Sequence, residues 1–109
     1  MIIKQGDAYG LPVSIEANGQ EITEDTLYLV DTVEIYLEDN FKEYKKDGSG
    51  EVTFAEGMFW YPMSQEESQQ LTEGPGKVDI RVKTIDGDVH GLPHPLRVTI
   101  ADARSRRVL

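Results

Sequence analysis

The amino-acid sequence predicts an all-β fold, an antiparallel β-sandwich with one short helix connecting strands. Apolar residues alternate with polar ones at period two in several separate segments, which is typical of strands with one face on a core. Glycine-containing turns separate these segments at roughly ten-residue spacing. A single segment carries a helix-start signal, and it is too short to form a layer of its own.

The first half of the chain supplies the first predicted strands. Residues 11–16 alternate apolar and polar side chains, and Pro12 among them indicates an edge strand because proline cannot donate to a ladder. A turn at Asn18 and Gly19 follows. Residues 33–38 alternate again with an acidic outer face, and we expect a further strand at 41–44 to extend or pair with them.

The middle of the chain combines a turn with a bulky aromatic segment. Residues 47–50 are rich in turn formers, and the alternation that follows them predicts a hairpin. The segment 58–63 is bulky at every position, so the period alone does not decide which side chains point inward. We favour Phe59, Tyr61 and Met63 as the inward set.

The second half of the chain contains the helix and the clearest hairpin. The capping-box pattern at 64–67 predicts a short helix that runs through about Leu71. Residues 78–83 and 96–100 alternate on either side of a turn at 86–87. This pattern predicts the strongest hairpin in the sequence.

Six or seven short strands with turns between them indicate an immunoglobulin-like sandwich without its disulfide. The 109 residues suit one domain, because a second core would have too little surface to bury. We place that domain at residues 1–103. The basic segment 104–109, with Arg104, Arg106 and Arg107, follows the last alternation and is expected to be a frayed tail.

Composition argues against several classes of partner and chemistry. Eleven basic and twenty acidic residues give a net charge of −9, which would repel a phosphate backbone, so we expect no nucleic-acid partner. The chain has no cysteine, which excludes disulfides and thiolate chemistry. Its start lacks the apolar run of a signal peptide, and no segment approaches the roughly twenty apolar residues that span a bilayer. We therefore expect a protein made in the cytoplasm, with no membrane partner.

Residues 45–56 match a calcium-binding EF-hand loop at its third, fifth, sixth, eighth and twelfth positions. Lys45 takes the place of the first oxygen ligand, and its ammonium would repel the cation. Gly57 and Pro62 disfavour the helix that should follow such a loop. We therefore expect a tight turn rather than a calcium site.

The two histidines do not form a convincing metal site in the sequence. His90 and His94 are four residues apart, but Gly91 and Pro93 lie between them and exclude a shared helix. Zinc would need about four ligands. Surface histidines are the favoured interpretation, although nearby aspartates could complete a weak site. We expect no metal and no cofactor.

The sequence shows no recognisable catalytic pattern. No serine lies in a nucleophile-elbow context, and the glycines form no phosphate-binding loop. Carboxylates are abundant, and the most clustered of them are interpreted as a solvated face rather than as an acid and base pair. These are Glu21, Glu24, Asp25, Glu38 and Asp39. We expect no enzymatic activity, with a hydrolase that uses carboxylates as the least favoured alternative.

Several phrases in the sequence carry a family resemblance. The chain opens with an apolar pair and a Gln-Gly-Asp turn at 2–7, followed by Leu-Pro-Val at 11–13, and related phrases lie at 46–50, 63–67 and 77–87. Together they resemble small immunoglobulin-like domains of baseplate (upper-baseplate-type) and tail-associated proteins in phages and prophages of Gram-positive bacteria. The resemblance implies a sandwich fold and a virion setting, and it transfers no catalytic residue.

The favoured functional hypothesis is a non-catalytic structural module of a phage or prophage tail or baseplate. Its expected partners are other tail or baseplate proteins and further copies of the chain. The expected interface combines the edge strand, through Leu11 and Val13, with the aromatic segment, through Trp60 and Tyr61. The alternative is a small-ligand or carbohydrate-binding module that uses the aromatic stretch 58–61 as a platform.

Overall fold

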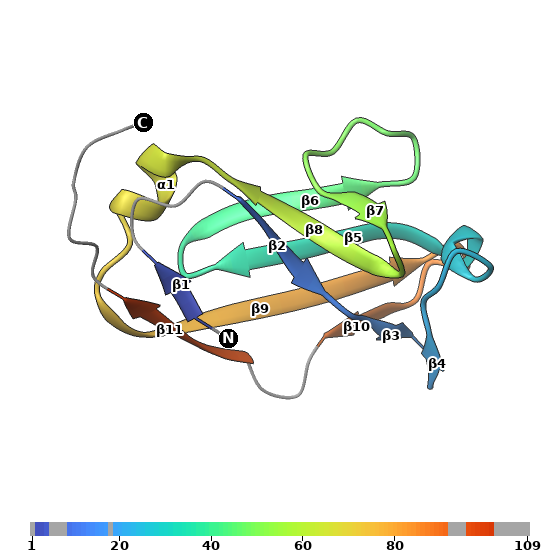
Figure 1. The fold of residues 1–109 in the computed structure, drawn as a ribbon. Coiled ribbons are helices and arrows are strands. Elements are labelled where there is room, and N and C mark those ends of the chain that lie inside the picture. Colours follow the sequence, from blue (N-terminus) through green and yellow to red (C-terminus); the bar gives the residue numbers. More distant parts are fainter. Residues whose placement is uncertain (1, 5–8, 18, 92–95, 102–109) are drawn as a thin grey trace.

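The computed structural model of the chain describes residues 2–4, 9–17, 19–91 and 96–101 (Figure 1). The strands are β1 (Ile2–Lys4), β2 (Tyr9–Val13), β3 (Glu16–Ala17), β4 (Gln20–Glu21), β5 (Val30–Leu37), β6 (Asn40–Lys45), β7 (Thr53–Ala55), β8 (Met58–Met63), β9 (Gly74–Thr84), β10 (Val89–Gly91) and β11 (Leu96–Ala101). The helices are the 3₁₀ helix η1 (Leu27–Leu29) and the α-helix α1 (Gln65–Gln69). The predicted tail at 104–109, the turn residue Asn18 and His94 lie outside the described residues.

The larger sheet has the strand order β1, β11, β9, β5 and β6, and β10 also pairs with β9. β9 lies at its centre, because β5 pairs with one edge of it while β10 and β11 pair with the other. The predicted hairpin of 78–83 and 96–100 is confirmed, since Leu96 lies opposite Val78 in an antiparallel register. The short β10 pairs with β9 directly after the turn, before β11 begins.

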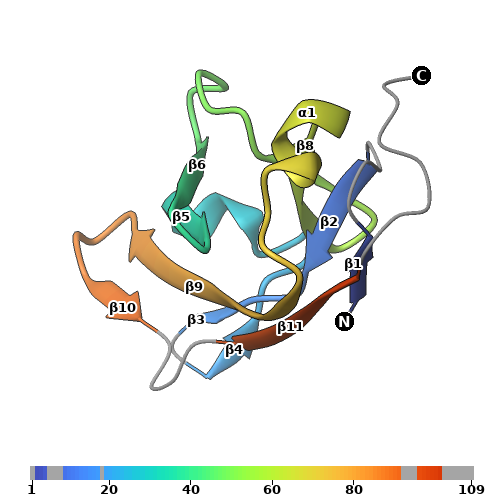
Figure 2. The ribbon, with the colours of Figure 1, turned by 90° about the vertical axis from the view of Figure 1, so that its left-hand side faces the viewer.

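The smaller sheet has the order β2, β8 and β7, and β3 and β4 form a separate two-stranded hairpin. The two sheets face each other across the core, with β2 and β8 over β5 and β9 (Figures 1 and 2). This division of strands is the immunoglobulin arrangement. The predicted all-β sandwich with one short connecting α-helix is therefore confirmed. β2 lies at an edge of its sheet, as Pro12 indicated.

Two tight hairpin turns depend on residues with positive φ. In the β5–β6 hairpin, Leu37 lies opposite Asn40, and Glu38 adopts a φ of 53° in the turn between them. In the β7–β8 hairpin, both turn residues have positive φ, 56° at Glu56 and 75° at Gly57. Positive φ at both central positions is what a type I′ turn requires, and this turn follows the twist of its flanking strands.

The segment between β6 and β7 crosses from the larger sheet to the smaller one. The hairpin predicted around residues 47–50 is therefore wrong, because its two arms lie in different sheets. The Val52 N–H donates to the Glu43 carbonyl oxygen at 3.1 Å, which ties the crossing segment to β6. Gly50 permits this close approach, since a Cβ there would overlap that oxygen and lie 3.0 Å from the Lys45 nitrogen.

The core lies between the two sheets and is formed by alternate residues of their strands. It consists of Ile3, Leu11, Val13, Ile15, Ile22, Val30, Val33, Ile35, Leu37, Val52, Phe59, Tyr61, Met63, Leu71, Val78, Ile80, Val82 and Ile100. The favoured parity of 58–63 is confirmed, because Phe59, Tyr61 and Met63 are at most 5% exposed. The Phe59 ring packs edge-on against Tyr44 and Phe54, at centroid distances of 5.2 and 4.8 Å.

The helix α1 connects β8 to β9 at one end of the sandwich (Figure 1). The predicted capping box is present: Ser64 Oγ accepts from the Glu67 N–H at 3.1 Å, and the Glu67 carboxylate accepts from the Ser64 N–H at 3.0 Å. The helix ends at Gln69, shortly before the predicted Leu71, which is buried in the core. Among the described residues, no helix has the length and apolar character needed to cross a membrane.

Candidate interaction surface

The large apolar side chains that remain exposed gather on the larger sheet and at one end of it. Among the described residues they are Tyr28 (61% exposed), Tyr36 (44%), Phe41 (41%), Ile85 (49%) and Val89 (57%). β5, β6 and β10 carry the central three, η1 leads into β5, and the last lies in the turn after β9. We call the side of the larger sheet that faces away from the smaller sheet the outer face. Exposed apolar clusters on a folded domain commonly mark sites of interaction.

Tyr36 and Phe41 form an exposed aromatic pair on the outer face. Strand parity directs Tyr36 outward, because its neighbours Ile35 and Leu37 are both buried in the core. The register of the β5–β6 hairpin places Phe41 directly opposite it. The two ring centroids are 4.9 Å apart and the rings are tilted by 44°. Aromatic rings that stay exposed in such a pair present a large, rigid contact area.

Charged groups surround this aromatic pair. On the neighbouring strand β9, Asp79 lies opposite Tyr36, and Arg81 lies opposite Glu34. Arg81 Nη2 and Glu34 Oε1 form an ion pair at 2.8 Å. A shallow depression of about 370 Å³ lies beside the ring of Tyr36, lined by Tyr36, Glu38, Asp39, Lys77 and Asp79. An aromatic centre with a polar rim is the usual anatomy of a protein-binding patch.

The remaining exposed apolar residues lie toward the other end of the larger sheet. Val89 lies opposite Lys83, an exposed residue of β9. The Ile85 N–H donates to the Leu29 carbonyl oxygen at 3.0 Å, which brings the β9–β10 turn beside η1 and its Tyr28. The outer face therefore offers apolar contact at both ends, with the Glu34 ion pair on β5 between them.

The structure corrects the predicted interface at three of its four residues. Leu11, Val13 and Tyr61 are core residues, with at most 4% of their surface exposed. The prediction was wrong because an edge strand still directs alternate side chains inward, and these three belong to the inward set. Trp60 is partly exposed on the smaller sheet. The main chain of β2, rather than its apolar side chains, is what that edge presents.

The aromatic segment 58–61 does not form a three-ring platform. Phe59 and Tyr61 are buried, which leaves Trp60 as the one partly exposed aromatic ring of the segment. Trp60 Nε1 donates to the Ala55 carbonyl oxygen at 2.9 Å. Its ring also covers Gly10 on β2, where a Cβ would lie 3.1 Å from Trp60 Cε3. This indole therefore braces the smaller sheet.

A buried polar network joins the two sheets beside α1. Lys42 Nζ, on β6, donates to the Pro62 carbonyl oxygen at 2.6 Å and forms an ion pair with Glu67 Oε2 at 2.8 Å. The same ammonium lies 5.1 Å from the centroid of the Tyr61 ring. The Tyr61 hydroxyl donates to the Asn40 carbonyl oxygen at 3.0 Å. These contacts satisfy the polar groups of the network within the fold.

The network shifts two pKa values in opposite directions. The hydrogen bond from Lys42, together with the bond from the Ser64 backbone, lowers the pKa of Glu67. Burial raises the pKa of Tyr61 to about 12, with smaller contributions from the carboxylates of Glu67 and Glu51. Neither shift moves a pKa toward neutrality, where a general acid or base would need it.

The other predicted polar residues lie apart from one another. The five carboxylates predicted as a solvated face are exposed: Glu21, Glu24, Asp25, Glu38 and Asp39. The Asp47 carboxylate accepts hydrogen bonds from the N–H and the hydroxyl of Ser49, at 2.9 and 2.6 Å, and these bonds lower its pKa. Glu56 lies in the β7–β8 turn and His90 lies on β10. Within the described part of the chain, no three His, Asp or Glu side chains are placed to hold a metal ion.

The aromatic pair on the outer face was not identified from the sequence. The alternation at 33–38 already directed Tyr36 outward together with Glu34 and Glu38. Its partner Phe41 is identified only by the register of the hairpin, which depends on the two-residue turn after Leu37. A register assigned from that turn would have predicted the pair.

No family model, curated protein or solved structure matches this chain.

Proposed function

We propose that this chain is a non-catalytic structural module of a phage or prophage tail or baseplate, which acts through protein–protein contacts made by the outer face of its larger sheet. The observation that carries the contact surface is the exposed pair Tyr36 and Phe41, with Val89 and Ile85 further along the same sheet. Tyrosine and phenylalanine are enriched at interfaces between proteins. The phage setting rests on the resemblance of the sequence phrases described above.

The charge of the chain favours selective docking. A net charge of −9 disfavours random association between copies and with other acidic surfaces. A partner must therefore cover the aromatic pair while complementing the charges around it, including Asp79 and Arg81. Complementarity of this kind contributes mainly to specificity and to the rate of association.

Co-expression with the products of the neighbouring genes tests the proposal. We expect a tail or baseplate protein to co-purify with the wild-type chain, and the double variant Tyr36→Ser, Phe41→Ser to lose most of that protein. Removing two exposed aromatic anchors from an interface typically weakens binding by at least about tenfold. The matched control is Trp60→Phe, which alters the smaller sheet and should retain the partner.

The surface assignment is contradicted if the control loses the partner and the double variant keeps it. The phage setting is contradicted separately, if none of the neighbouring genes encodes a tail or baseplate protein.

A further inference from the structure

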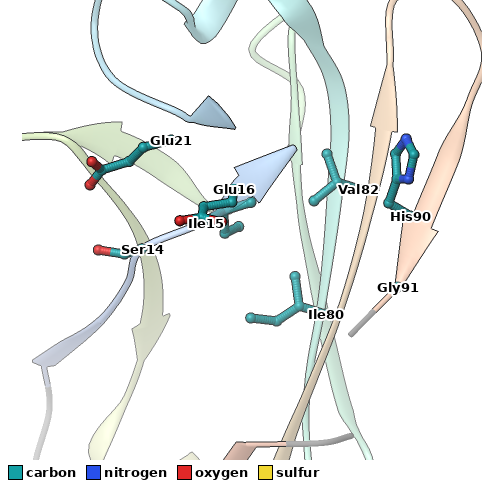
Figure 3. Close-up of a pocket in the computed structure, with 8 residues that line it drawn as sticks. All are labelled: Ser14, Ile15, Glu16, Glu21, Ile80, Val82, His90 and Gly91. Atoms are coloured by element: carbon teal, nitrogen blue, oxygen red, sulfur yellow. The ribbon is translucent and has the colours of Figure 1, made fainter. Parts of the chain in front are cut away.

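A groove opens between the β3–β4 hairpin and the strands β9 and β10 (Figure 3). Its volume is about 470 Å³. It lies on the core side of the larger sheet, away from the outer face. The residues that line it are Ser14, Ile15, Glu16, Glu21, Ile80, Val82, His90 and Gly91.

The floor of the groove is apolar because the core side of the larger sheet continues past the cover of the smaller sheet. His90 lies opposite Val82, so the two side chains share the same face of the sheet. Val82 and Ile80 are each 3% exposed, whereas His90 is exposed. Ile15 completes the floor from the opposite wall (Figure 3).

The β3–β4 wall of the groove carries two carboxylates without compensation. Glu16 lies directly opposite Glu21 in the hairpin, and both side chains are exposed. Like charges directly opposite each other destabilise an antiparallel pair. None of the ion pairs formed among the described residues uses either carboxylate. A bound cationic group would relieve this repulsion.

We propose that the groove receives the segment 104–109 of a second copy of this chain. That segment contains Arg104, Arg106 and Arg107 followed by two apolar residues, Val108 and Leu109. Its arginines complement the carboxylates of the hairpin wall, and its apolar residues match the floor. In a chain of net charge −9 it is the one cluster of basic residues.

The segment docks as an extended strand. Among the described residues, β4 pairs only with β3, and β10 only with β9, so each has an edge free to bond a further strand. Adding a strand to such an edge supplies main-chain hydrogen bonds, while pockets take alternate side chains.

Reach along the sandwich favours a second copy over the chain's own segment. β11 ends beside Gly74, the first residue of β9, and Val82 lies 82 − 74 = 8 residues further along that strand. Eight residues of strand span about 26 Å. An extended chain advances at most about 3.5 Å per residue, so from Ala101 it carries Arg104 about 11 Å and Arg106 about 18 Å. The arginines of the same copy therefore fall short of the groove floor at Val82.

This inference rests on the proposed function as a contact module and names one of its partners, a second copy. Reciprocal docking of two copies gives a closed dimer, and one-way docking gives an open chain of copies. Both arrangements use the groove and leave the outer face available for a different protein.

Charge reversal in the full-length chain tests the inference. The groove variant is Glu16→Lys, Glu21→Lys, and the tail variant is Arg104→Glu, Arg106→Glu, Arg107→Glu. Sedimentation equilibrium over a concentration series measures self-association at low ionic strength, where exposed ion pairs are least screened. We expect the wild type to self-associate and each variant alone to weaken that association by about tenfold. An equimolar mixture of the two variants should recover it, because the acidic groove of one meets the basic segment of the other.

Circular dichroism and thermal unfolding of each variant establish that both remain folded, as expected for exposed positions. The inference is overturned if the wild type is monomeric at every concentration, if single variants associate like the wild type, or if the mixture does not recover association. The outer-face variant Tyr36→Ser, Phe41→Ser separates this failure from failure of the proposed function. If that variant alone abolishes self-association, the outer face joins the copies, and the groove does not.

Discussion

Replacing Gly50 with alanine tests the crossing between the two sheets. An alanine Cβ would overlap the Glu43 carbonyl oxygen and lie 3.0 Å from the Lys45 nitrogen, and both obstacles are backbone atoms that no side-chain rotation removes. Overpacking of this kind costs about 1–3 kcal/mol, and loss of the Val52 hydrogen bond to that oxygen costs about 1 kcal/mol more. The lower entropy of the unfolded alanine chain offsets about 0.4–1 kcal/mol. We expect a net loss of about 2 kcal/mol.

Thermal and denaturant unfolding measure this loss directly. With an unfolding entropy of about 2.1 cal/mol/K per residue, 2 kcal/mol corresponds to a fall of about 9 °C in Tm for 109 residues. Gly91→Ala is the matched control, because its Cβ would approach Arg81 Cγ no closer than 3.5 Å, and its stability should change by less than about 1 kcal/mol. A Gly50→Ala variant as stable as the wild type would refute the crossing.

Three further changes address the core and the network beside α1. Phe59→Ala removes a fully buried ring and should lower the unfolding free energy by about 3–5 kcal/mol in denaturant titration; an unchanged value would contradict its place in the core. Tyr61 has a folded pKa of about 12 against about 10 when unfolded, so stability is complete below pH 10 and falls as the pH rises toward 12. Tyr61→Phe should flatten that fall in unfolding curves measured across this range, and an unchanged slope would refute the assignment. Glu67 has a lowered folded pKa, so its contribution is present above the unfolded pKa of about 4.3 and is lost as the pH falls through the folded value; Glu67→Gln should remove that acid-dependent loss, and a variant with the wild-type acid profile would contradict it.

The sequence predicted elements more reliably than it predicted their neighbours. Alternation at 33–38 and the capping box at 64–67 are local signals, and both elements are present where they were expected. The parity of 58–63 was inferred correctly as well. The turn formers at 47–50 predicted a change of direction, but no local signal states whether the next strand joins the same sheet or the opposite one.

The candidate surface was harder to predict than the fold. Leu11 and Val13 were chosen because they lie on an edge strand, but their burial follows from the sheet that covers them, which is a long-range property. Tyr36 and Phe41 become neighbours through strand register. The groove likewise depends on how far one sheet extends beyond the other, and no residue pattern records that extent.

Hydroxyl-radical footprinting of the assembled protein tests the central claim most directly. The sample is the complex with the neighbouring gene product that co-purifies, and the reference is the dilute chain. The account predicts protection of Tyr36 and Phe41 on the larger sheet, with unchanged oxidation of Trp60 on the smaller sheet. Protection of Trp60 with unchanged oxidation of the aromatic pair would contradict it.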